Sequence, residues 1–227
     1  AKAPKDGSSL LLTSSSLEAR VINEQLSRID ALTHTYRNLT THALANEGGA
    51  LPSNLALTAD GVRYSSSDDG HPAVFYSNRT PAGQHDLLAI ARLTTTAPLM
   101  KEITAQNGLV AAIYYNSASS LNYIYPWFDT PAQYPHDMNI PEYNFYYLAD
   151  ATHNPDKRVV WTDVYLDPAG QGWMMSAIAP VYQGDQLAGV VGLDITVGNI
   201  LKEISHLQIP WNGYAMVVSK DMNIMAM

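Results

Sequence analysis

The stretch that decides the fold is residues 173–195, WMMSAIAPVYQGDQLAGVVGLDI. Both of its halves, 173–182 and 187–195, are rich in apolar side chains, several of them β-branched, which favour β-strands. Gly184 and Asp185 stand between the halves, and such a short connection is typical of a β-hairpin. The stretch therefore predicts two long antiparallel strands that lie side by side.

Shorter strands are predicted before this hairpin, because short extended runs alternate with turn residues along the chain. Gly170, Gln171 and Gly172 are expected to form the turn that leads into the hairpin. The runs that we interpret as strands are 62–64, 73–76, 109–115, 121–127 and 159–166. Together with the hairpin they predict an antiparallel sheet.

A long helix is predicted over residues 15–46. Ser15 and Glu18 match a capping box, and apolar residues then recur at spacings of three and four from Ile22 to Ala43. Two interpretations of this helix remain open. It either covers the core of one chain, or it is a stalk that also pairs with a second copy.

Three shorter helical segments are predicted inside and after the sheet. They are 84–106 with a restart at Pro98, 143–149, and 197–207 with Thr196 as its N-cap. A helix followed by an antiparallel sheet with helices on its faces is an α+β pattern, and the order of elements fits a PAS-like sensor fold.

The end of the chain predicts a second, smaller unit. Residues 214–218 and 224–227 are typical of two strands, and two strands alone are not independently stable. We therefore divide the chain into an N-terminal helix at 1–47, a PAS-like subdomain at 48–207, and the beginning of a second PAS-like subdomain at 208–227.

Composition excludes several classes of partner. The chain has 227 residues and a formal net charge of −8, which does not suit a nucleic-acid partner. It has no cysteine, which excludes thiolate metal sites and cysteine nucleophiles and favours an oxidising compartment. No apolar run approaches the roughly 20 residues of a membrane span, so any membrane anchor is expected outside this chain.

Enzyme signatures are missing from the sequence. It contains no G-x-S-x-G, Walker, H-E-x-x-H or S-x-x-K motif, and its seven histidines form no pair at i, i+4 on a helix. We expect no metal, no cofactor and no catalysis. Pairs among the aspartates leave a carboxylate-dependent secreted hydrolase as a distant alternative.

Aromatic residues gather near short polar ones, and this pattern carries the site prediction. Tyr123, Tyr125 and Trp127 alternate along one predicted strand, as Trp161, Tyr165 and Asp167 do along another, so each set is expected on one strand face. Rings with carboxylates form a natural box for a small polar or cationic ligand. The predicted ligand-binding residues are Tyr125, Trp127, Tyr146, Trp161, Tyr165, Asp167 and Asp194.

Two of these assignments have a structural alternative. The aromatic rings can instead simply build the core. Asp194 lies shortly before the helix predicted at 197–207, so it can instead favour the positive start of that helix.

At this point a family resemblance becomes visible. Residues 161–173, WTDVYLDPAGQGW, followed by APVY at 179–182 and GVVGLDI at 189–195, resemble the double Cache sensor domains. These are the periplasmic parts of many bacterial histidine kinases, diguanylate cyclases and chemoreceptors. YIYPW at 123–127 and NFYY at 144–147 are similar to the same group.

The resemblance implies a function for the chain. It would be the extracytoplasmic sensor of a membrane receptor, most simply a histidine kinase, and residues 48–207 would form the membrane-distal subdomain that holds a small molecule. Residues 208–227 would begin the membrane-proximal subdomain, and the N-terminal helix would form a homodimer in the full receptor. The alternative is a ligand-free structural or dimerisation module of such a receptor.

One departure from the family pattern bears on the ligand. Amino-acid-binding members carry Arg-x-Trp-Tyr ahead of the strand that contains Trp161, and the arginine grips the ligand carboxylate. The matching stretch here is Tyr143-Asn144-Phe145-Tyr146, without an arginine. The aspartates that hold an ammonium in amino-acid binders remain, so the expected ligand is an amine or another neutral or cationic metabolite.

Overall fold

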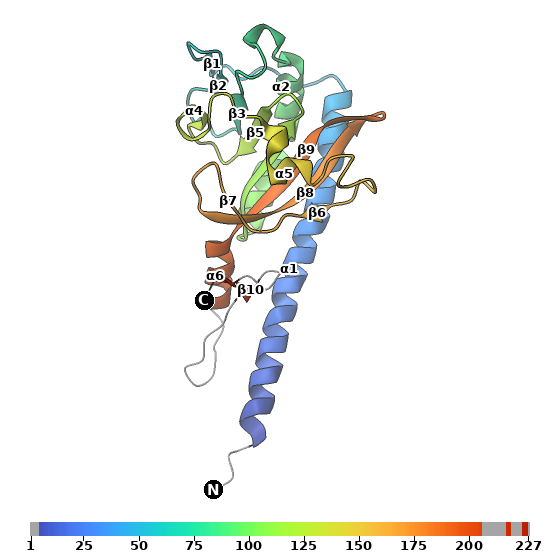
Figure 1. The fold of residues 1–227 in the computed structure, drawn as a ribbon, viewed down its shortest axis with the longest axis vertical. Coiled ribbons are helices and arrows are strands. Elements are labelled where there is room, and N and C mark those ends of the chain that lie inside the picture. The colour runs from blue at the N-terminus through green and yellow to red at the C-terminus, as the bar shows by residue number, and fades with distance from the viewer. Residues whose placement is uncertain (1–4, 206–216, 219–223, 227) are drawn as a thin grey trace.

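The computed structural model describes residues 5–205, 217–218 and 224–226, and side chains between residues 20 and 203. Within these residues, nine strands form one sheet in the order β1-β2-β3-β5-β4-β9-β8-β6, with β7 also paired to β8, and every pairing is antiparallel (Figure 1). The strands are β1 (Leu55–Leu57), β2 (Arg63–Ser65), β3 (Ala73–Tyr76), β4 (Val110–Ser117), β5 (Leu121–Tyr125), β6 (Val160–Trp161), β7 (Tyr165–Leu166), β8 (Trp173–Gln183) and β9 (Gln186–Thr196). The predicted α+β class is confirmed.

The hairpin predicted from residues 173–195 forms the two longest strands of this sheet. β8 and β9 are paired from Met174 and Thr196 to Gln183 and Gln186, and Gly184 takes a φ of 59° in the turn between them. A positive φ favours glycine, because a Cβ would be crowded there. The turn residue therefore agrees with the predicted hairpin.

The strand predicted over residues 159–166 is wrong in one respect. It is broken into β6 and β7, which pair with different parts of β8, Trp161 opposite Ala177 and Tyr165 opposite Met174. Thr162 interrupts the run by binding β8 itself, because its hydroxyl accepts a hydrogen bond from the backbone N–H of Ser176 at 2.9 Å. The strict alternation of side chains is lost between the two short strands.

The N-terminal helix is longer than predicted. α1 runs over Lys5–Ala45, roughly 60 Å at about 1.5 Å per residue, and its N-terminal part extends well away from the sheet (Figure 1). Ser15 therefore lies inside the helix and is not its cap. Once a helix has formed, each added residue gains a backbone hydrogen bond, so a local capping pattern does not stop it.

One face of the sheet is covered by helices. The C-terminal half of α1 packs across β8 and β9, and α2 (Leu87–Leu93) and α3 (Ala97–Gln106) cover the same face. Pro98 stands in the first turn of α3, as predicted. We call this the packing face. Its fully buried side chains include Ile113, Tyr123, Ala177, Val191 and Leu193.

The opposite face is covered by the long connection between β5 and β8. This connection contains α4 (Thr130–Gln133), the short 3-10 helix η3 (Ile140–Glu142) and α5 (Asn144–Tyr147). Residues 143–149 were predicted to be helical, and α5 confirms a short helix there. We call this second face the site face, because the pocket described below lies on it.

The end of the chain agrees with the prediction as far as it is described. α6 (Val197–Ser205) follows β9, and the Thr196 hydroxyl accepts from the backbone N–H of Asn199 at 3.0 Å, so Thr196 is its N-cap. β10 (Val217–Val218) and β11 (Ile224–Ala226) form a separate two-stranded sheet. The other residues of 208–227 lie outside the described part, and the subdomain boundaries remain a prediction.

Candidate ligand-binding pocket

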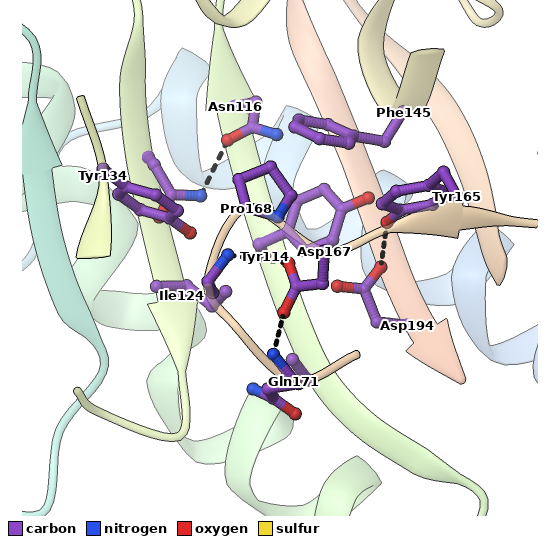
Figure 2. Close-up of a pocket in the computed structure, with 13 residues that line it drawn as sticks. Tyr114, Asn116, Ile124, Tyr134, Phe145, Tyr165, Asp167, Pro168, Gln171 and Asp194 are labelled. Carbon is purple, nitrogen blue, oxygen red and sulfur yellow. Dashed lines mark hydrogen bonds between the residues drawn. The ribbon is translucent and has the colours of Figure 1, made fainter. Parts of the chain in front are cut away.

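A small pocket lies on the site face of the sheet, between strands β4, β5 and β9 and the covering connection (Figure 2). Its volume is about 20 Å³, which is room for about one water molecule. The residues that line it are Ala112, Tyr114, Asn116, Asn122, Ile124, Tyr134, Phe145, Tyr165, Asp167, Pro168, Ala169, Gln171 and Asp194. They are aromatic, apolar, amide or acidic, and none is a lysine, arginine or histidine.

The floor of the pocket depends on a glycine. Tyr114 on β4 lies opposite Gly192 on β9, and a Cβ on Gly192 would come within 2.3 Å of the Tyr114 ring. The glycine therefore lets this ring lie flat across the neighbouring strand. Burial, and then the nearby charge of Asp194, raise the pKa of Tyr114 far above its usual value, so the phenol stays neutral.

Asp194 is the acid at the centre of the pocket. It is 5% exposed, and its Oδ1 accepts hydrogen bonds from the hydroxyls of Ser176 at 2.5 Å and Tyr165 at 3.3 Å. The same two hydroxyls are 2.6 Å apart. Burial, assisted by the charge of Asp167, raises the pKa of Asp194 to about 7. The carboxyl therefore gains or loses its proton near neutral pH.

Amides and a phenol form the other polar edge of the pocket. Asn122 on β5 donates from Nδ2 to Oδ1 of Asn116 on β4 at 2.7 Å, and its own Oδ1 accepts from the Tyr134 hydroxyl at 3.4 Å. These amides are buried, and buried polar groups without partners are costly. Their pairing with each other keeps a polar surface inside the domain.

The turn at residues 167–172 covers the pocket and is fastened to itself (Figure 2). The two carboxylate oxygens of Asp167 accept from the backbone N–H groups of Ala169 at 3.0 Å and Gln171 at 3.1 Å. The backbone N–H of Asp167 donates to the Gly172 carbonyl at 2.9 Å. Burial raises the pKa of Asp167, against the effect of its two backbone donors.

This arrangement suits a positively charged group. Two carboxyls and several rings converge on a buried space, and no cationic side chain lines it to neutralise them. Below about pH 7 Asp194 is mostly protonated, which removes the negative charge that such a cation would otherwise balance. A bound ammonium would favour the ionised carboxylate and could also contact the aromatic rings.

The structure brings three of the seven predicted site residues together. Tyr165, Asp167 and Asp194 all line the pocket, and Tyr165 binds Asp194 directly. Thr196 caps α6 and the Asp194 carboxylate faces the pocket, so Asp194 is not needed to start that helix. A ligand-binding role for these three residues stays a prediction.

The other four predicted residues lie outside the pocket lining. Trp161 is on the packing face, where its Nε1 donates to Oδ1 of Asp30 on α1 at 3.3 Å. The break between β6 and β7 separates it from Tyr165. Tyr146 lies on α5 and is 4% exposed, in an apolar cluster on the site face, but it does not line the pocket.

Tyr125 and Trp127 separate because β5 ends between them. Tyr125 is the last residue of β5 and packs with the core of the packing face. Trp127 follows Pro126, packs beside Ile124 on the site face, and donates from Nε1 to the Ser65 carbonyl at 3.3 Å. The expectation that alternation continues through residue 127 is therefore wrong.

Several pocket residues were not singled out from the sequence. The most important are Tyr114, Asn116 and Asn122, which line the pocket, and Ser176, which binds Asp194; each is on a predicted strand or directly beside one. A usable signal existed, because a lone amide or hydroxyl among apolar strand residues indicates either a solvated edge or a buried polar site. Only the sheet order distinguishes these two cases.

Two further properties of the described residues bear on function. No group of three histidine, aspartate or glutamate side chains among them is placed to hold a metal ion. Among the helices of the described residues, none is both long and apolar enough to cross a membrane.

The fold and the pocket define a sensor domain of the PAS-like, double Cache type. The model of the family described as "Methyl-accepting chemotaxis protein-like, first PDC sensor domain" matches residues 87–202, which include all the residues that line the pocket and its covering turn. That is half of the chain, and the chain belongs to this family of chemotaxis-receptor sensor domains.

Comparisons with individual proteins agree. The chain is 25% identical over 127 residues to the methyl-accepting chemotaxis protein McpC of Bacillus subtilis, which covers 56% of this chain and 18% of McpC. It is 33% identical over 100 residues to PctB of Pseudomonas aeruginosa, which covers 44% of this chain and 15% of PctB. The chain thus spans less than a fifth of either relative.

A solved structure has the same fold over nearly the whole chain. The ligand-binding domain of the Pseudomonas aeruginosa amino acid chemoreceptor PctC, in complex with GABA, superposes with a TM-score of 0.61. The match covers 98% of this chain and 77% of that one, at 19% sequence identity. At this level of sequence identity, the similarity is evidence for a shared fold alone.

Proposed function

We propose that this chain is the extracytoplasmic, membrane-distal ligand-binding domain of a chemotaxis receptor, and that its ligand is a small amine. The observation that carries the proposal is the buried Asp194, which lies among rings and hydroxyls with no cationic side chain lining its pocket. An ammonium group would supply the missing positive charge.

The relatives that the chain matches in sequence support one type of receptor. McpC and PctB are methyl-accepting chemotaxis proteins, which favours a chemotaxis receptor over the histidine kinase expected from the family resemblance. The output part and the membrane spans would lie outside this chain. In the full receptor we expect two copies to pair along the exposed side of α1.

The lining of the pocket favours an amine over an amino acid as the ligand. PctC was solved with GABA, which carries a carboxylate as well as an ammonium. Here the residues that would face a ligand carboxylate are Asn116, Asn122 and Gln171, which are neutral, and Asp167 would repel it. A carboxylate is normally gripped by an arginine or lysine. A ligand with only a positive charge fits better.

Entry of such a ligand requires the covering turn to lift. A volume of about 20 Å³ cannot hold even a small amine, so the described conformation is closed. The turn at 167–172 is joined to β8 through β7, and its side-chain hydrogen bonds are internal. By contrast, the 128–142 segment is tied to the chain just after β3, since the backbone N–H of Asn78 donates to the His136 carbonyl at 2.9 Å.

A signal could pass from the pocket through the sheet. Ser176 and Asp194 lie on β8 and β9, and the other face of these two strands packs against α1. A ligand that shifts β8 against β9 would change the surface on which α1 rests. Such coupling works only to the extent that the ligand binds the two states differently.

The test uses three four-carbon ligands that differ only in charge. We would titrate the chain with n-butylamine, GABA and butyrate by calorimetry at pH 8, and repeat the titrations with Asp194→Asn. Butylamine is expected to bind, GABA at least about tenfold more weakly, and Asp194→Asn to lose butylamine binding. Asp163→Asn, which changes an exposed acid in the same segment, serves as the matched control.

The alternatives give different results. If the folded chain binds neither butylamine nor any amine of a wider panel of primary and quaternary amines, the result would favour the ligand-free module. Equal affinity of wild type and Asp194→Asn for butylamine would remove Asp194 from the site. A carboxylate-dependent hydrolase is not favoured, because both carboxylate oxygens of Asp167 accept backbone hydrogen bonds within its own turn.

A further inference from the structure

A second, larger cavity lies at the end of the domain farthest from the N-terminus of α1. It is enclosed by the C-terminal end of α1, helix α2, and the turns of the β4–β5 and β8–β9 hairpins, which meet at this end (Figure 1). We call it the distal cavity. Its volume is about 330 Å³, within the range of about 300–1,000 Å³ usual for small-molecule pockets.

Arg92 on α2 is the cation of the distal cavity. Its Nη1 donates to the Leu44 carbonyl at 2.9 Å, in the last turn of α1. Its Nε is buried and has no hydrogen-bond acceptor among the described residues. A guanidinium has five N–H donors in a flat fork, so most of this fork remains available, and an unsatisfied buried donor is costly.

Hydroxyl groups lie along the floor of the same cavity. The Ser119 hydroxyl is 2.6 Å from the Tyr76 hydroxyl and 3.0 Å from the Ser117 hydroxyl. Since hydroxyl hydrogens can rotate, this short chain can donate to an oxygen that enters the cavity. The fork of Arg92 and the hydroxyl chain are both parts of the lining.

Apolar side chains make up much of the remaining wall. They are Leu44, Leu88, Ala89, Ala118, Leu121, Leu187 and Ala188. Leu88 is 57% exposed at the rim, although it is a large apolar residue. Asp86 also lines the cavity, but its carboxylate already caps α2 by accepting from the Ala89 N–H at 2.9 Å.

We propose that the distal cavity is a second ligand site, which binds a small monocarboxylate with a short apolar chain. The carboxylate would take the unused donors of Arg92 and the hydroxyls of Ser117 and Ser119, and the chain would lie against the leucines. Since Nε is also shielded from solvent, the side chain of Arg92 turns slightly into the cavity when the ligand binds. Asp86 disfavours a second negative charge.

This site is connected to α1. In the empty state Arg92 caps one of the last carbonyls of α1, a position where helices have no internal partner. A ligand carboxylate competes with the Leu44 carbonyl for the same guanidinium. Binding in the distal cavity would therefore loosen the end of α1, independently of the amine pocket on the opposite face of the sheet.

The test begins with the wild-type chain, so that no variant has to fold. Backbone amide resonances would be recorded by two-dimensional NMR during titration with sodium butyrate and, as the uncharged isostere, butyramide. Butyrate should move the resonances of residues 117–121 and 183–188, and butyramide should not. Shifts confined to residues 167–172 and 194, or equal effects of the two compounds, would overturn the proposal.

Variants then assign the role of the arginine. Arg92→Gln should weaken butyrate binding by at least about tenfold, and Arg92→Lys, which keeps the charge without the fork, by less. Two control variants should leave butyrate affinity unchanged. They are Arg79→Gln, which changes an exposed arginine outside the cavity, and Asp194→Asn. If folded Arg92→Gln binds butyrate as tightly as wild type does, the proposal is overturned. A failure of the chain to bind amines would contradict only the proposed function of the other pocket.

Discussion

The two faces of the sheet are equally buried but differ in chemistry, and the difference begins between neighbouring residues. Leu193 lies in the apolar core under α1, and Asp194 lies in the pocket among hydroxyls, although both are at most 5% exposed. On β8, Ala177 and Ser176 show the same contrast. Both faces have buried apolar residues, but the site face also carries a cluster of buried polar groups.

Those polar groups indicate function because they cost stability. A buried polar group stabilises a protein only when its hydrogen bonds are satisfied, and an apolar replacement of the same shape is often neutral or better. Asp194, Ser176 and Tyr165 satisfy one another, but a carboxyl in this position still has its pKa raised by burial. The packing face has no comparable acid among its described residues, so the comparison points to the site face for ligand binding.

The largest expected effect falls on the packing face. Leu193→Ala would leave a cavity beneath α1 and should lower the free energy of unfolding by about 2–5 kcal/mol. Urea denaturation would measure it. Amine affinity of the folded chain should stay within about threefold, because the side chain points away from the pocket. A large loss of amine affinity without a loss of unfolding free energy would contradict the distinction between the two faces.

The next effect concerns pH and falls on the site face. The pKa of Asp194 is raised from 3.8 to about 7 by folding, so the folded chain holds a proton that the unfolded chain releases. The contribution of this group to stability should therefore be fully present below about pH 4 and be lost as pH rises through about 7, by on the order of 4 kcal/mol. Asp167, whose pKa is also raised, acts in the same direction.

The Asp194→Asn variant isolates this contribution. The pH profile of wild type also contains other groups, such as His85, whose pKa is lowered by burial, and His136, whose pKa is raised by its bond to Asp60. The difference between the two proteins removes these contributions. We expect the difference in unfolding free energy to change steadily between pH 4 and 7 and to be flat above pH 8. A difference that does not vary with pH would contradict a raised pKa.

Two glycines of β9 provide a smaller and matched comparison. A Cβ on Gly192 would meet the Tyr114 ring of the pocket, and a Cβ on Gly189 would meet the Tyr115 ring and the Asn116 carbonyl at 2.2 Å. Both alanine variants should lose about 1–3 kcal/mol by overpacking. Only Gly192→Ala should also change amine affinity, measured by calorimetry. An equal loss of affinity in Gly189→Ala would mean that the pocket responds to the whole sheet.

The fold was largely predictable from the sequence because it depends on local patterns. The apolar runs and Gly184 predicted the β8–β9 hairpin, and Pro98 and Thr196 were placed correctly at helix starts. The start of α1 was wrong by ten residues, since the pattern at Ser15 is a local preference that helix propagation overrides.

The site was less predictable because it depends on which strands are neighbours. Tyr165 and Asp194 were identified, but Ser176 and Asn116 reach the pocket only through the register of β8 and β4 against β9. Trp161 was misplaced because an irregularity after Thr162 shifts the register on β8 by one residue, from Trp161 opposite Ala177 to Tyr165 opposite Met174. Periodicity alone cannot reveal such an irregularity.

The smallest expected effect decides what Asp167 does. Asp167→Asn keeps one oxygen for the Ala169 N–H but replaces the acceptor of the Gln171 N–H by a donor, which should cost about 1 kcal/mol and loosen the turn. If Asp167 mainly fastens the turn, the association and dissociation rates of an amine should rise together, and the affinity should hardly change. If its carboxylate contacts the ammonium, dissociation alone should accelerate. Stopped-flow measurement against the Asp163→Asn control separates the two cases, and the second result would make the site face a binding surface built from both of its aspartates.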